Sequence, residues 1–405
     1  MNHIVVIGAG QAGCSLAIKL RALGFDGQIT LIGEEPAPPY QRPPLSKAYL
    51  LGEMQRERLY LRPRAFYDDQ NITLRLGQRA QAIDPAARTV TVDGQTIAYD
   101  QLVLTTGSVP RRLPAAIGGD LPGVYTVRTL ADADAMAPEF TAGRRVLIVG
   151  GGYIGLEAAA VAAKRGLSVT LVEMAGRILQ RVAAPETSDY FRALHRSHGV
   201  RIIEGTGLEH LTGTGRVSRA RLADGQSFDV DFVIVGVGIT PATGLAEAAG
   251  LTIDNGIRVD AGGRSSDPSV WAAGDCASFP WKGGRIRLES VPNAIDQAEA
   301  VAANILGAGR DYVATPWFWS DQYDVKLQIA GLNAGYEDVV ARGGGGGGEG
   351  PVSFWYYRGD RLIAVDAMNA PREYMIAKRL IEMGKSPGKA EVANPETDLK
   401  ALLKG

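Results

Sequence analysis

Gly8-Ala9-Gly10-Gln11-Ala12-Gly13 and Gly150-Gly151-Gly152-Tyr153-Ile154-Gly155 repeat one glycine pattern within this chain. Apolar stretches that predict β-strands, His3–Ile7 and Val146–Val149, precede the two copies, and helical patterns follow them. In this setting the first glycine permits a tight turn, the second lets the backbone approach a diphosphate, and the third lets helix and strand pack closely. The helix N-terminus then offers amide donors to the phosphates. The pattern predicts two dinucleotide-binding units in one polypeptide.

An acidic residue follows the next predicted strand after each glycine pattern. After the first pattern, Glu34 is better placed than Glu35 to accept hydrogen bonds from the adenosine ribose hydroxyls. After the second, Glu173 would accept from a free 2′-hydroxyl and repel a 2′-phosphate, which favours NADH over NADPH. Arg177 lies nearby and opposes this preference weakly. The alternative for both acids is an ordinary surface position.

A third motif indicates which unit holds a flavin. The apolar strand predicted over Val270–Ala273 ends on Gly274 and Asp275, shortly before a helix that begins near Pro292. Asp275 is placed to bind the ribityl chain of FAD, and the positive end of the following helix would face the pyrimidine edge of the flavin. A simple turn is the alternative interpretation of Gly274-Asp275.

Composition is that of a globular protein of two or three domains. The chain has 405 residues, 45% apolar and 21% charged, with a net charge of −1, which argues against a nucleic-acid or membrane-surface role. No apolar run approaches the ~20 residues of a membrane span. The first predicted strand begins at His3, which leaves no room for a signal peptide. We expect a cytoplasmic protein.

Cysteines and histidines show no catalytic or metal-ligand spacing. Cys14 and Cys276 form neither a C-x-x-C nor a C-x-x-x-x-C pair, so we expect two structural thiols and no dithiol relay. His195 and His198 are three residues apart, on what reads as the solvated side of a crossover helix. We expect no metal site.

The order of elements predicts an α/β fold with one dinucleotide domain inserted in another. A strand–helix–strand unit opens the chain, and a loop is predicted over Ser108–Gly123. A proline-rich segment covers 36–48, in which we expect no regular helix before about Ser46. The glycine run Gly343–Gly348 predicts a flexible surface connection. We expect two Rossmann-like domains and a C-terminal α+β domain: FAD-binding 1–112 with 242–315, NADH-binding 113–241, and C-terminal 316–405.

The chain resembles, over essentially its whole length, the NADH-dependent ferredoxin reductases of oxygenase systems, a branch of the glutathione-reductase-like flavoproteins. The residues that carry the resemblance are Pro39-Tyr40-Gln41-Arg42-Pro43-Pro44-Leu45-Ser46-Lys47, Thr105-Thr106-Gly107-Ser108, Val127-Arg128-Thr129, Ala273-Gly274-Asp275, Glu289-Ser290-Val291-Pro292-Asn293 and Phe318-Trp319-Ser320-Asp321-Gln322.

The resemblance implies a set of cofactor-binding residues. It implies flavin contacts from Ala12, Glu34, Lys47, Ala80, Arg128, Asp275 and Val291. We also expect cofactor-binding roles for Gly8, Gly10, Gly13, Arg42, Pro43, Thr106, Gly107, Gly274 and Pro292. The resemblance implies an NADH site lined by Gly152, Ile154, Glu173 and Gly238, and we expect Gly150, Tyr153 and Gly155 of the second glycine pattern to bind a cofactor as well. The guanidinium of Arg128 suits a diphosphate, and the stiff Pro43 suits a wall against an aromatic ring.

Three residues are candidates for a part in the reaction itself. Lys47 would hold a cation near the flavin, and the resemblance implies that Glu157 pairs with it. An early-helix acid favoured by the macrodipole is the alternative for Glu157. Trp319 resembles a family tryptophan near the flavin, with a core aromatic of the last domain as the alternative.

The predicted activity is electron transfer from NADH through FAD to a two-iron two-sulfur ferredoxin that feeds a haem-thiolate or Rieske oxygenase. Hydride transfer needs orientation rather than a protein acid or base, and without a disulfide the electrons would leave singly. An acidic ferredoxin would dock on a basic face, either around Arg56, Arg58, Arg62 and Arg64 or around Lys378, Arg379 and Lys385, unless these are solvated surfaces.

Other functions of the same scaffold remain open at this point. A rubredoxin reductase would differ only in its partner. An NADH oxidase or peroxidase usually has a redox-active cysteine near residues 40–50, where this chain has Ser46. A flavoprotein that senses NADH, of the apoptosis-inducing-factor-like kind, would form a slow, long-lived NADH–flavin complex.

Overall fold

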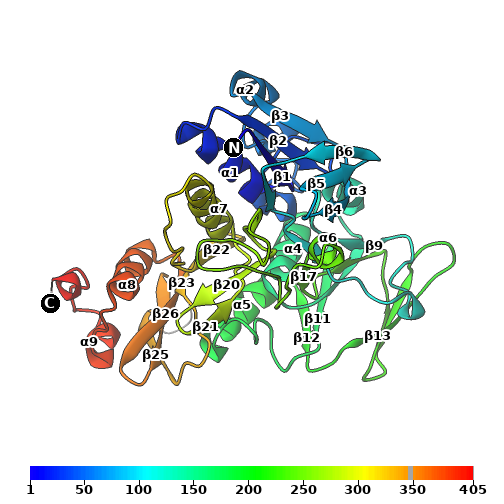
Figure 1. Cartoon of the computed structure of the whole chain (residues 1–405). Helices are drawn as coiled ribbons and strands as arrows, with labels where there is room; N and C mark the ends of the chain where they lie inside the picture. The colour runs from blue at the N-terminus through cyan, green and yellow to red at the C-terminus, as the bar shows by residue number, and fades with distance from the viewer. Residues whose placement is uncertain (345–349, 405) are drawn as a thin grey trace. The chain divides into compact units, whose positions relative to one another are not determined.

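The computed structural model describes residues 1–344 and 350–404, which divide into two compact units (Figure 1). The first unit comprises Met1–Arg42, Met54–Val109 and Ile239–Ala314, and the second comprises Pro43–Glu53, Pro110–Gly238 and Thr315–Gly405. Each unit contains one of the two glycine patterns. The second unit also contains the C-terminal sheet.

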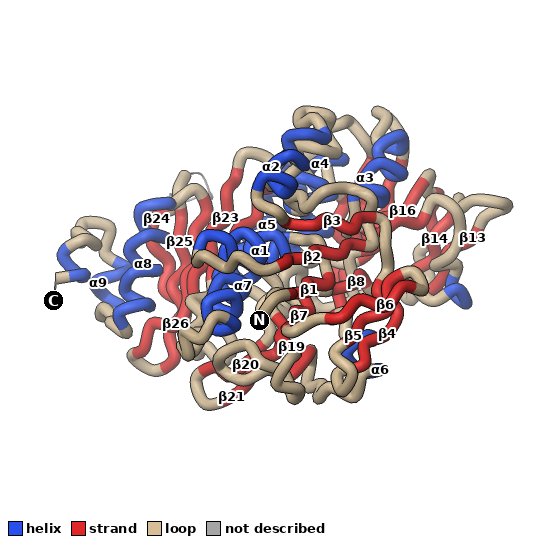
Figure 2. The backbone as a smooth tube through the Cα atoms, turned by 45° about the horizontal axis from the view of Figure 1, so that its top comes forward, coloured by secondary structure: helices blue, strands red, loops and turns tan. Residues whose placement is uncertain are grey.

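The first unit is built on a parallel sheet of order β19-β7-β1-β2-β3. Its strands are nearly continuous apolar runs, because both faces of a parallel sheet are covered. Helices α1 and α7 pack against each other, as Figure 2 shows. Strand order reverses beside β1, which is where ligands bind in open α/β sheets. The sheet and helix bounds are β1 His3–Ile7, β2 Gln28–Gly33, β3 Ile72–Leu76, β7 Gln101–Leu104, β19 Val270–Ala272, α1 Gln11–Ala22 and α7 Val291–Ile305.

Smaller elements complete the first unit. The antiparallel meander β4-β5-β6 packs Ile83, Val90 and Val92 in one hydrophobic cluster with residues of β1 and β7. The bounds are β4 Ala80–Asp84, β5 Thr89–Val92, β6 Gln95–Ala98, β8 Ser108–Pro110, β17 Ile239–Pro241, β18 Ile257–Arg258, β20 Ala277–Trp281, β21 Gly284–Ile286, α2 Arg64–Asp69, α6 Gly244–Ala248 and the 3-10 turn η2 Arg56–Leu59.

The second unit repeats the parallel architecture, with strand order β12-β11-β10-β16-β9. Helix α4 is almost wholly apolar and buried, with a single carboxylate, Glu157, inside it. The bounds are β9 Val124–Thr126, β10 Arg145–Val149, β11 Ser168–Glu173, β12 Arg201–Glu204, β16 Phe232–Val235, β13 Leu208–Thr212, β14 Arg219–Leu222, β15 Ser227–Asp229, α3 Leu130–Met136, α4 Tyr153–Lys164, α5 Pro185–Ser197, η1 Pro43–Ser46, η3 Ala115–Ile117 and η4 Ala137–Glu139.

The C-terminal part of the second unit is an antiparallel sheet of order β22-β23-β26-β25-β24. Helix α8 packs against β26 and β23, and α4 packs against β22. The bounds are β22 Trp317–Gln322, β23 Val325–Gly331, β24 Asp338–Gly343, β25 Val352–Arg358, β26 Arg361–Met368, α8 Pro371–Met383, α9 Lys389–Ala393 and η5 Ala401–Leu403.

The predicted α/β fold class is confirmed, and two local predictions are wrong. Ser108–Gly123 is not a continuous loop, because Ser108–Pro110 forms strand β8 and Ala115–Ile117 forms a 3-10 turn. Within the proline-rich segment, helical backbone begins at Pro43, since the fixed φ of proline suits the first positions of a turn. Of the glycine run, Gly343 ends β24, and residues 345–348 lie outside the described residues.

Candidate functional site

The first glycine pattern forms a cradle at the end of β1. Gly8 has φ +114°, and a Cβ there would lie 2.1 Å from the carbonyl oxygen of Thr105. A Cβ on Gly13 would lie 2.1 Å from the carbonyl oxygen of Gly8. A Cβ on Gly10 would meet no protein atom within 4 Å. Close packing therefore requires glycine at positions 8 and 13, as predicted. Gly10 instead borders open space that a ligand can approach.

The second glycine pattern has the same geometry at the end of β10. Gly150 has φ +108°, and its added Cβ would lie 2.4 Å from the carbonyl oxygen of Gly236. A Cβ on Gly155 would lie 2.0 Å from the carbonyl oxygen of Gly150. Gly152 again meets nothing within 4 Å. Two cradles of equal construction thus stand in two separate units.

Both cradles present uncapped helix N-termini. Gly10 and Gly152 are the N-cap residues of α1 and α4, and neither helix has a side-chain cap or an acidic residue in its first turn. The first backbone N–H groups of a helix lack intrahelical acceptors and carry the positive end of its dipole. Open space beside a glycine and uncapped amides together fit the diphosphate of a dinucleotide.

Two acidic residues follow β2, and Glu35 makes more side-chain contacts than Glu34, the predicted ribose ligand. Glu34 has 69% of its side chain exposed and forms an ion pair of 3.5 Å with Arg79. Glu35 accepts from the Tyr40 hydroxyl at 2.6 Å and from the Arg42 guanidinium at 2.7 Å. Exposure leaves Glu34 able to meet a ribose, and that role stays a prediction. Glu35 instead anchors Arg42, a contact that the sequence pattern did not indicate.

Asp275 lies in the first unit beside a second set of polar groups. The Ser108 hydroxyl donates to its Oδ2 at 2.9 Å. The backbone N–H of Gly274 donates to Gln297 Oε1 at 2.9 Å, and the buried Nε2 of Gln297 has no hydrogen-bond partner among the described residues. A buried donor without a partner is rare in proteins. Its position beside Gly274 and Asp275 fits a polar group of a bound flavin nucleotide.

The acid beside the second cradle is held by backbone amides. Glu173 accepts from Gly151 N–H at 2.6 Å through Oε2 and from Ala175 N–H at 2.8 Å through Oε1. Arg177 is turned to other partners: it donates to the Ser188 hydroxyl and, at 2.8 Å, to the Ala183 carbonyl oxygen. Glu173 therefore has a fixed carboxylate at the end of β11, and Arg177 is engaged elsewhere.

Lys47 and Glu157 form the predicted pair within the second unit. Lys47 Nζ lies 3.1 Å from Glu157 Oε1 and 3.3 Å from Asp321 Oδ2. Ser46 donates to Glu157 Oε2 at 2.9 Å, and Ser320 donates to Oε1 at 2.7 Å. Burial raises the pKa of Glu157, while the Lys47 cation and the two hydroxyls oppose that rise. The alternative of an early-helix acid favoured by the macrodipole does not describe Glu157, because its side chain is buried and lies beyond the first turn of α4.

Two aromatic site candidates belong to the neighbourhood of β22. Trp319 is half-buried, with its ring centroid 5.8 Å from that of Trp317. The Tyr153 ring meets Phe318 edge-on at 4.9 Å, and its hydroxyl is buried without a hydrogen-bond partner among the described residues. The side chain of Tyr153 thus points into the protein interior, which leaves its backbone N–H for a nucleotide.

The remaining predicted site residues divide between the two units, and their roles stay predictions. In the first unit, Thr106 donates to the Ala242 carbonyl oxygen at 2.7 Å, and Gly107 has φ +70°. In the second, Arg128 donates its backbone N–H to Asp132 at 3.1 Å. Ala12 lies in α1, Ala80 begins β4, Val291 and Pro292 begin α7, Pro43 begins η1, Ile154 is 45% exposed on α4, and Gly238 has φ +100° after β16.

His195 corrects the prediction of a solvated helix face. It is fully buried, with Nε2 2.8 Å from Gln322 Oε1 and Nδ1 3.2 Å from the Tyr323 hydroxyl. His198 is the exposed residue of the two and stacks on Tyr323 at 3.7 Å. The three-residue spacing suggested that both histidines share one solvated face of the helix. In the structure His195 lies on the buried face of α5, with Phe191, and His198 follows the helix on the exposed side. His195 joins Ser46, Ser320 and Gln297 as polar residues whose burial the sequence patterns did not indicate.

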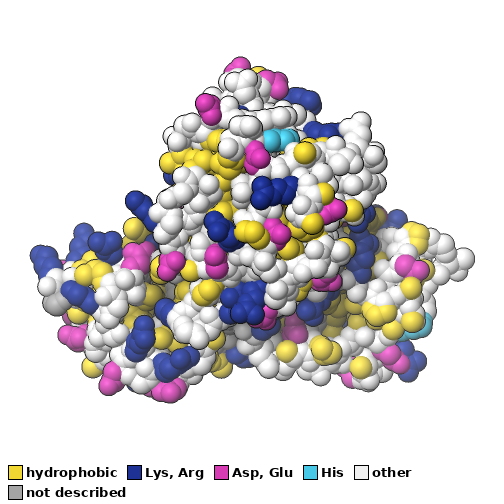
Figure 3. Space-filling view, in the orientation of Figure 1, with side chains coloured by type: hydrophobic (Ala, Val, Ile, Leu, Met, Phe, Trp, Pro, Cys, Tyr) yellow, Lys and Arg dark blue, Asp and Glu magenta, His cyan; other side chains and the backbone are white. Residues whose placement is uncertain are grey.

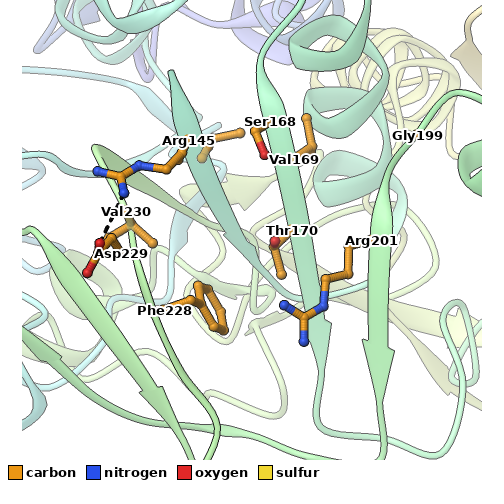
Figure 4. A pocket seen from close by; sticks show the side chains of 10 residues that line it. Arg145, Ser168, Val169, Thr170, Gly199, Arg201, Phe228, Asp229 and Val230 are labelled. Atoms are coloured by element: carbon orange, nitrogen blue, oxygen red, sulfur yellow. Dashed lines mark hydrogen bonds and ion pairs between the residues drawn. The ribbon is translucent and has the colours of Figure 1, made fainter. Parts of the chain in front are cut away.

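A separate pocket of about 330 Å³ lies at the amino ends of β10, β11 and β12 (Figure 4), whereas Gly150–Gly152 follow the carboxyl end of β10. It is lined by the first residues of β10, β11 and β12, among them Arg145, Ser168 and Arg201. Arg145 is paired with Asp229 across it at 3.2 Å. Because dinucleotides bind at the carboxyl ends of parallel strands, this pocket is not the cofactor cradle.

Among residues 1–344 and 350–404, no group of three or more His, Cys, Asp and Glu side chains is arranged to hold a metal ion. Over the same part of the chain, no helix is long and apolar enough to cross a membrane. Cationic and anionic side chains are interspersed on the face shown in Figure 3. Cys14 and Cys276 are both free and buried.

Comparison with known proteins identifies the family. Residues 2–298 match the pyridine nucleotide-disulphide oxidoreductase family, and residues 317–403 match the reductase C-terminal family. The chain therefore belongs to the pyridine nucleotide-disulphide oxidoreductases.

The relatives that match nearly the whole chain include ferredoxin reductases. A ferredoxin–NAD(P)(+) reductase from Sphingomonas sp. is 46% identical over 99% of this chain and 97% of its own length. The ferredoxin reductase subunit of 5,5′-dehydrodivanillate O-demethylase from Sphingobium sp. is 43% identical over 98% and 97%. The solved covalent complex of putidaredoxin reductase with putidaredoxin contains a chain with a TM-score of 0.95 and 40% identity, covering 100% of this chain and 98% of that one. The resemblance to ferredoxin reductases is confirmed.

Proposed function

We propose that this protein carries electrons from NADH, through bound FAD, to a two-iron two-sulfur ferredoxin that supplies a haem-thiolate monooxygenase or a Rieske oxygenase. Its relatives are named as ferredoxin reductases, one of them as a subunit of an O-demethylase. When bound, FAD accepts a hydride from NADH and passes the electrons on singly, which is chemistry that no side chain supplies.

The observation that carries the proposal is the pair of open glycine cradles in a chain whose two cysteines are buried and free. Two cradles provide for two dinucleotides. Without a disulfide to reduce, the electrons need an acceptor outside the chain. Ser46, which stands where a redox-active cysteine would be expected in an oxidase or peroxidase, donates a hydrogen bond to Glu157.

The chain's own residues would bind and orient the two nucleotides. The uncapped amides of α1 and α4 would bind the diphosphates, with Gly10 and Gly152 leaving the space. Asp275, held by Ser108, would bind the ribityl chain. Lys47 is held by Glu157, and the resemblance implies that its cation takes part in flavin reduction. The proposed domains are those expected from the sequence: 1–112 with 242–315, 113–241 and 316–405.

NADH is the proposed donor, in preference to NADPH. The carboxylate of Glu173 is held by two backbone amides and would accept from a free 2′-hydroxyl. Arg177 is bound to Ser188 and Ala183, which supports the preference because a 2′-phosphate would lack this cation.

The proposed ferredoxin docking surface is the basic cluster around η2 and the start of α2. Its arginines Arg56, Arg58, Arg62 and Arg64 are all exposed. An acidic one-electron carrier would be steered toward such a surface.

We also propose a cytoplasmic location, which suits two unpaired thiols.

Stopped-flow spectroscopy tests the function. The FAD-loaded protein is reduced with NADH and then mixed with ferredoxins encoded in the same genome. Rapid flavin bleaching followed by rapid ferredoxin reduction supports the proposal. Rapid transfer to rubredoxin alone would assign a rubredoxin reductase. A slow, long-lived NADH–flavin complex with no transfer would assign the NADH-sensing role.

A further inference from the structure

A continuous row of hydrogen bonds runs through the second unit from Tyr323 to Glu157. The Tyr323 hydroxyl lies 3.2 Å from His195 Nδ1, and His195 Nε2 lies 2.8 Å from Gln322 Oε1. Gln322 Nε2 donates to Ser320 Oγ at 3.2 Å, and Ser320 Oγ donates to Glu157 Oε1 at 2.7 Å. Ser320, Gln322 and His195 are each fully buried.

The direction of every donor in this row is fixed by the carboxylate at its end. An ionised Glu157 only accepts, so the single hydroxyl proton of Ser320 points to it. Ser320 Oγ must then accept from the amide nitrogen of Gln322. The amide oxygen therefore faces His195 and accepts from Nε2–H, which leaves Nδ1 to accept from Tyr323.

Burial keeps the histidine neutral, as this arrangement requires. Burial lowers the pKa of His195 to about 4, so one ring nitrogen donates and the other accepts at neutral pH. All the N–H and O–H dipoles of the row then point toward Glu157. Aligned donors of this kind stabilise a negative charge more than one isolated hydrogen bond does.

We propose that His195 is a positioning residue that, through Gln322 and Ser320, keeps Glu157 ionised and thereby keeps Lys47 charged and fixed. The effect on the charge of Glu157 follows from the row of hydrogen bonds alone. The benefit to a bound flavin, through Lys47, rests on the proposed function.

Other groups around Glu157 are consistent with this assignment. The Lys47 cation approaches it from the segment after η1, and Asp321 of β22 shares that cation. Tyr153, one helical turn earlier on α4, is neutral, because burial raises the pKa of its hydroxyl far above the ordinary value. Ser46 provides the remaining donor.

Infrared titration of the FAD-loaded protein tests the assignment without relying on turnover. The band of protonated Glu157 is identified by its loss in Glu157→Gln. His195→Leu removes the donor at similar bulk, and His195→Gln retains a neutral N–H. We expect His195→Leu to increase the proton affinity of Glu157 about threefold to tenfold, because Gln322 and Ser320 lose the aligned donor that polarises them toward the carboxylate. His195→Gln should restore most of the difference.

His198→Leu, three residues along and exposed, is the matched control and should leave the titration unchanged. If His195→Leu does not fold, Tyr323→Phe replaces it as the test, because it removes only the hydroxyl at the far end of the row. A smaller increase in the proton affinity of Glu157 in Tyr323→Phe supports the proposal. An unchanged Glu157 titration in folded His195→Leu, or in Tyr323→Phe where that variant decides, overturns it. A failure of the proposed function would instead appear as no ferredoxin reduction by the unmodified protein, whatever the titration shows.

Discussion

Lys47 Nζ lies 3.1 Å from Glu157 Oε1, although the two residues come from a proline-rich turn and from the interior of a buried helix. Both side chains are mostly withdrawn from solvent, with 17% and 5% exposed. Removing one partner of such a pair leaves an uncompensated buried charge, which typically costs about 3–5 kcal/mol.

Lys47→Met should therefore lower the free energy of unfolding by about 3 kcal/mol at pH 8 and slow flavin reduction by NADH about 10- to 100-fold. The stability loss should shrink as the pH falls, because the pKa of Glu157 is raised in the folded state and the carboxyl is neutralised by a proton. Urea denaturation and stopped-flow reduction measure the two effects. Lys164→Met, exposed at the end of α4, is the control. Equal rates in both variants would remove Lys47 from the reaction.

The glycine cradles predict a separation between folding and binding. Gly10→Val should fold but lose FAD, and Gly152→Val should retain FAD but lose NADH, because each added side chain fills space that borders no protein atom. Gly13→Ala should fail to fold stably, since its Cβ would lie 2.1 Å from a carbonyl oxygen. Visible absorbance and NADH titration measure the outcome. A yellow Gly10→Val protein would contradict the assignment of the first cradle.

Glu173 should set the preference between the two nicotinamide donors. Glu173→Ala removes an acceptor for the 2′-hydroxyl and a repulsive charge, so we expect the KM for NADH to rise about tenfold and the NADH-to-NADPH ratio of kcat/KM to fall. Steady-state kinetics with a small artificial acceptor measure both. An unaltered NADH-to-NADPH ratio of kcat/KM would show that Glu173 only accepts the backbone hydrogen bonds of Gly151 and Ala175 and does not select the donor.

Asp366 is expected to make stability depend on pH. It is fully buried in β26 and accepts from Tyr356 and, at 2.7 Å, from Thr187, yet burial raises its pKa from 3.8 to about 6. The folded state then binds the proton more tightly than the unfolded state. This contribution to stability is complete below about pH 4 and is lost as the pH rises through 6.

Asp366→Asn should remove this slope, which amounts to up to about 3 kcal/mol between pH 4 and pH 7. Urea denaturation at several pH values measures it. Asp360→Asn, exposed in the turn between β25 and β26, is the matched control. A slope that persists in Asp366→Asn would assign the pH dependence to another group.

Arg64 tests the proposed docking surface. Arg64→Glu should raise the KM for ferredoxin about tenfold, with a stronger effect at low salt, and leave reduction of a small artificial acceptor unchanged. Arg379→Glu reverses an exposed charge in the second basic cluster and is the control. It should leave the KM for ferredoxin unchanged if the effect of Arg64→Glu is specific to the cluster around η2. Unchanged ferredoxin kinetics in Arg64→Glu would remove the cluster around η2 from the docking surface.

Local sequence patterns predicted the parallel sheets well. The strands, the two glycine turns and the following helices depend on short-range periodicity and on the steric freedom of glycine, both visible within a dozen residues. The resemblance then supplied Lys47 and Glu157 as a pair. It did not indicate that Ser46 and Ser320 donate to the same carboxylate, or that Glu35 rather than Glu34 holds Arg42.

The sequence by itself determined the fold class, the two cradles and the lack of a C-x-x-C or C-x-x-x-x-C dithiol, because each depends on residue type and local spacing. Only the tertiary structure decided that His195 is buried and joined to Glu157 through Gln322 and Ser320. Hydrogen bonds between Glu157 and residues 111 and 163 positions away depend on which strands and helices pack together. No local pattern carries that information, since a polar residue in an apolar segment has the same sequence signature whether its partner is water or a distant side chain.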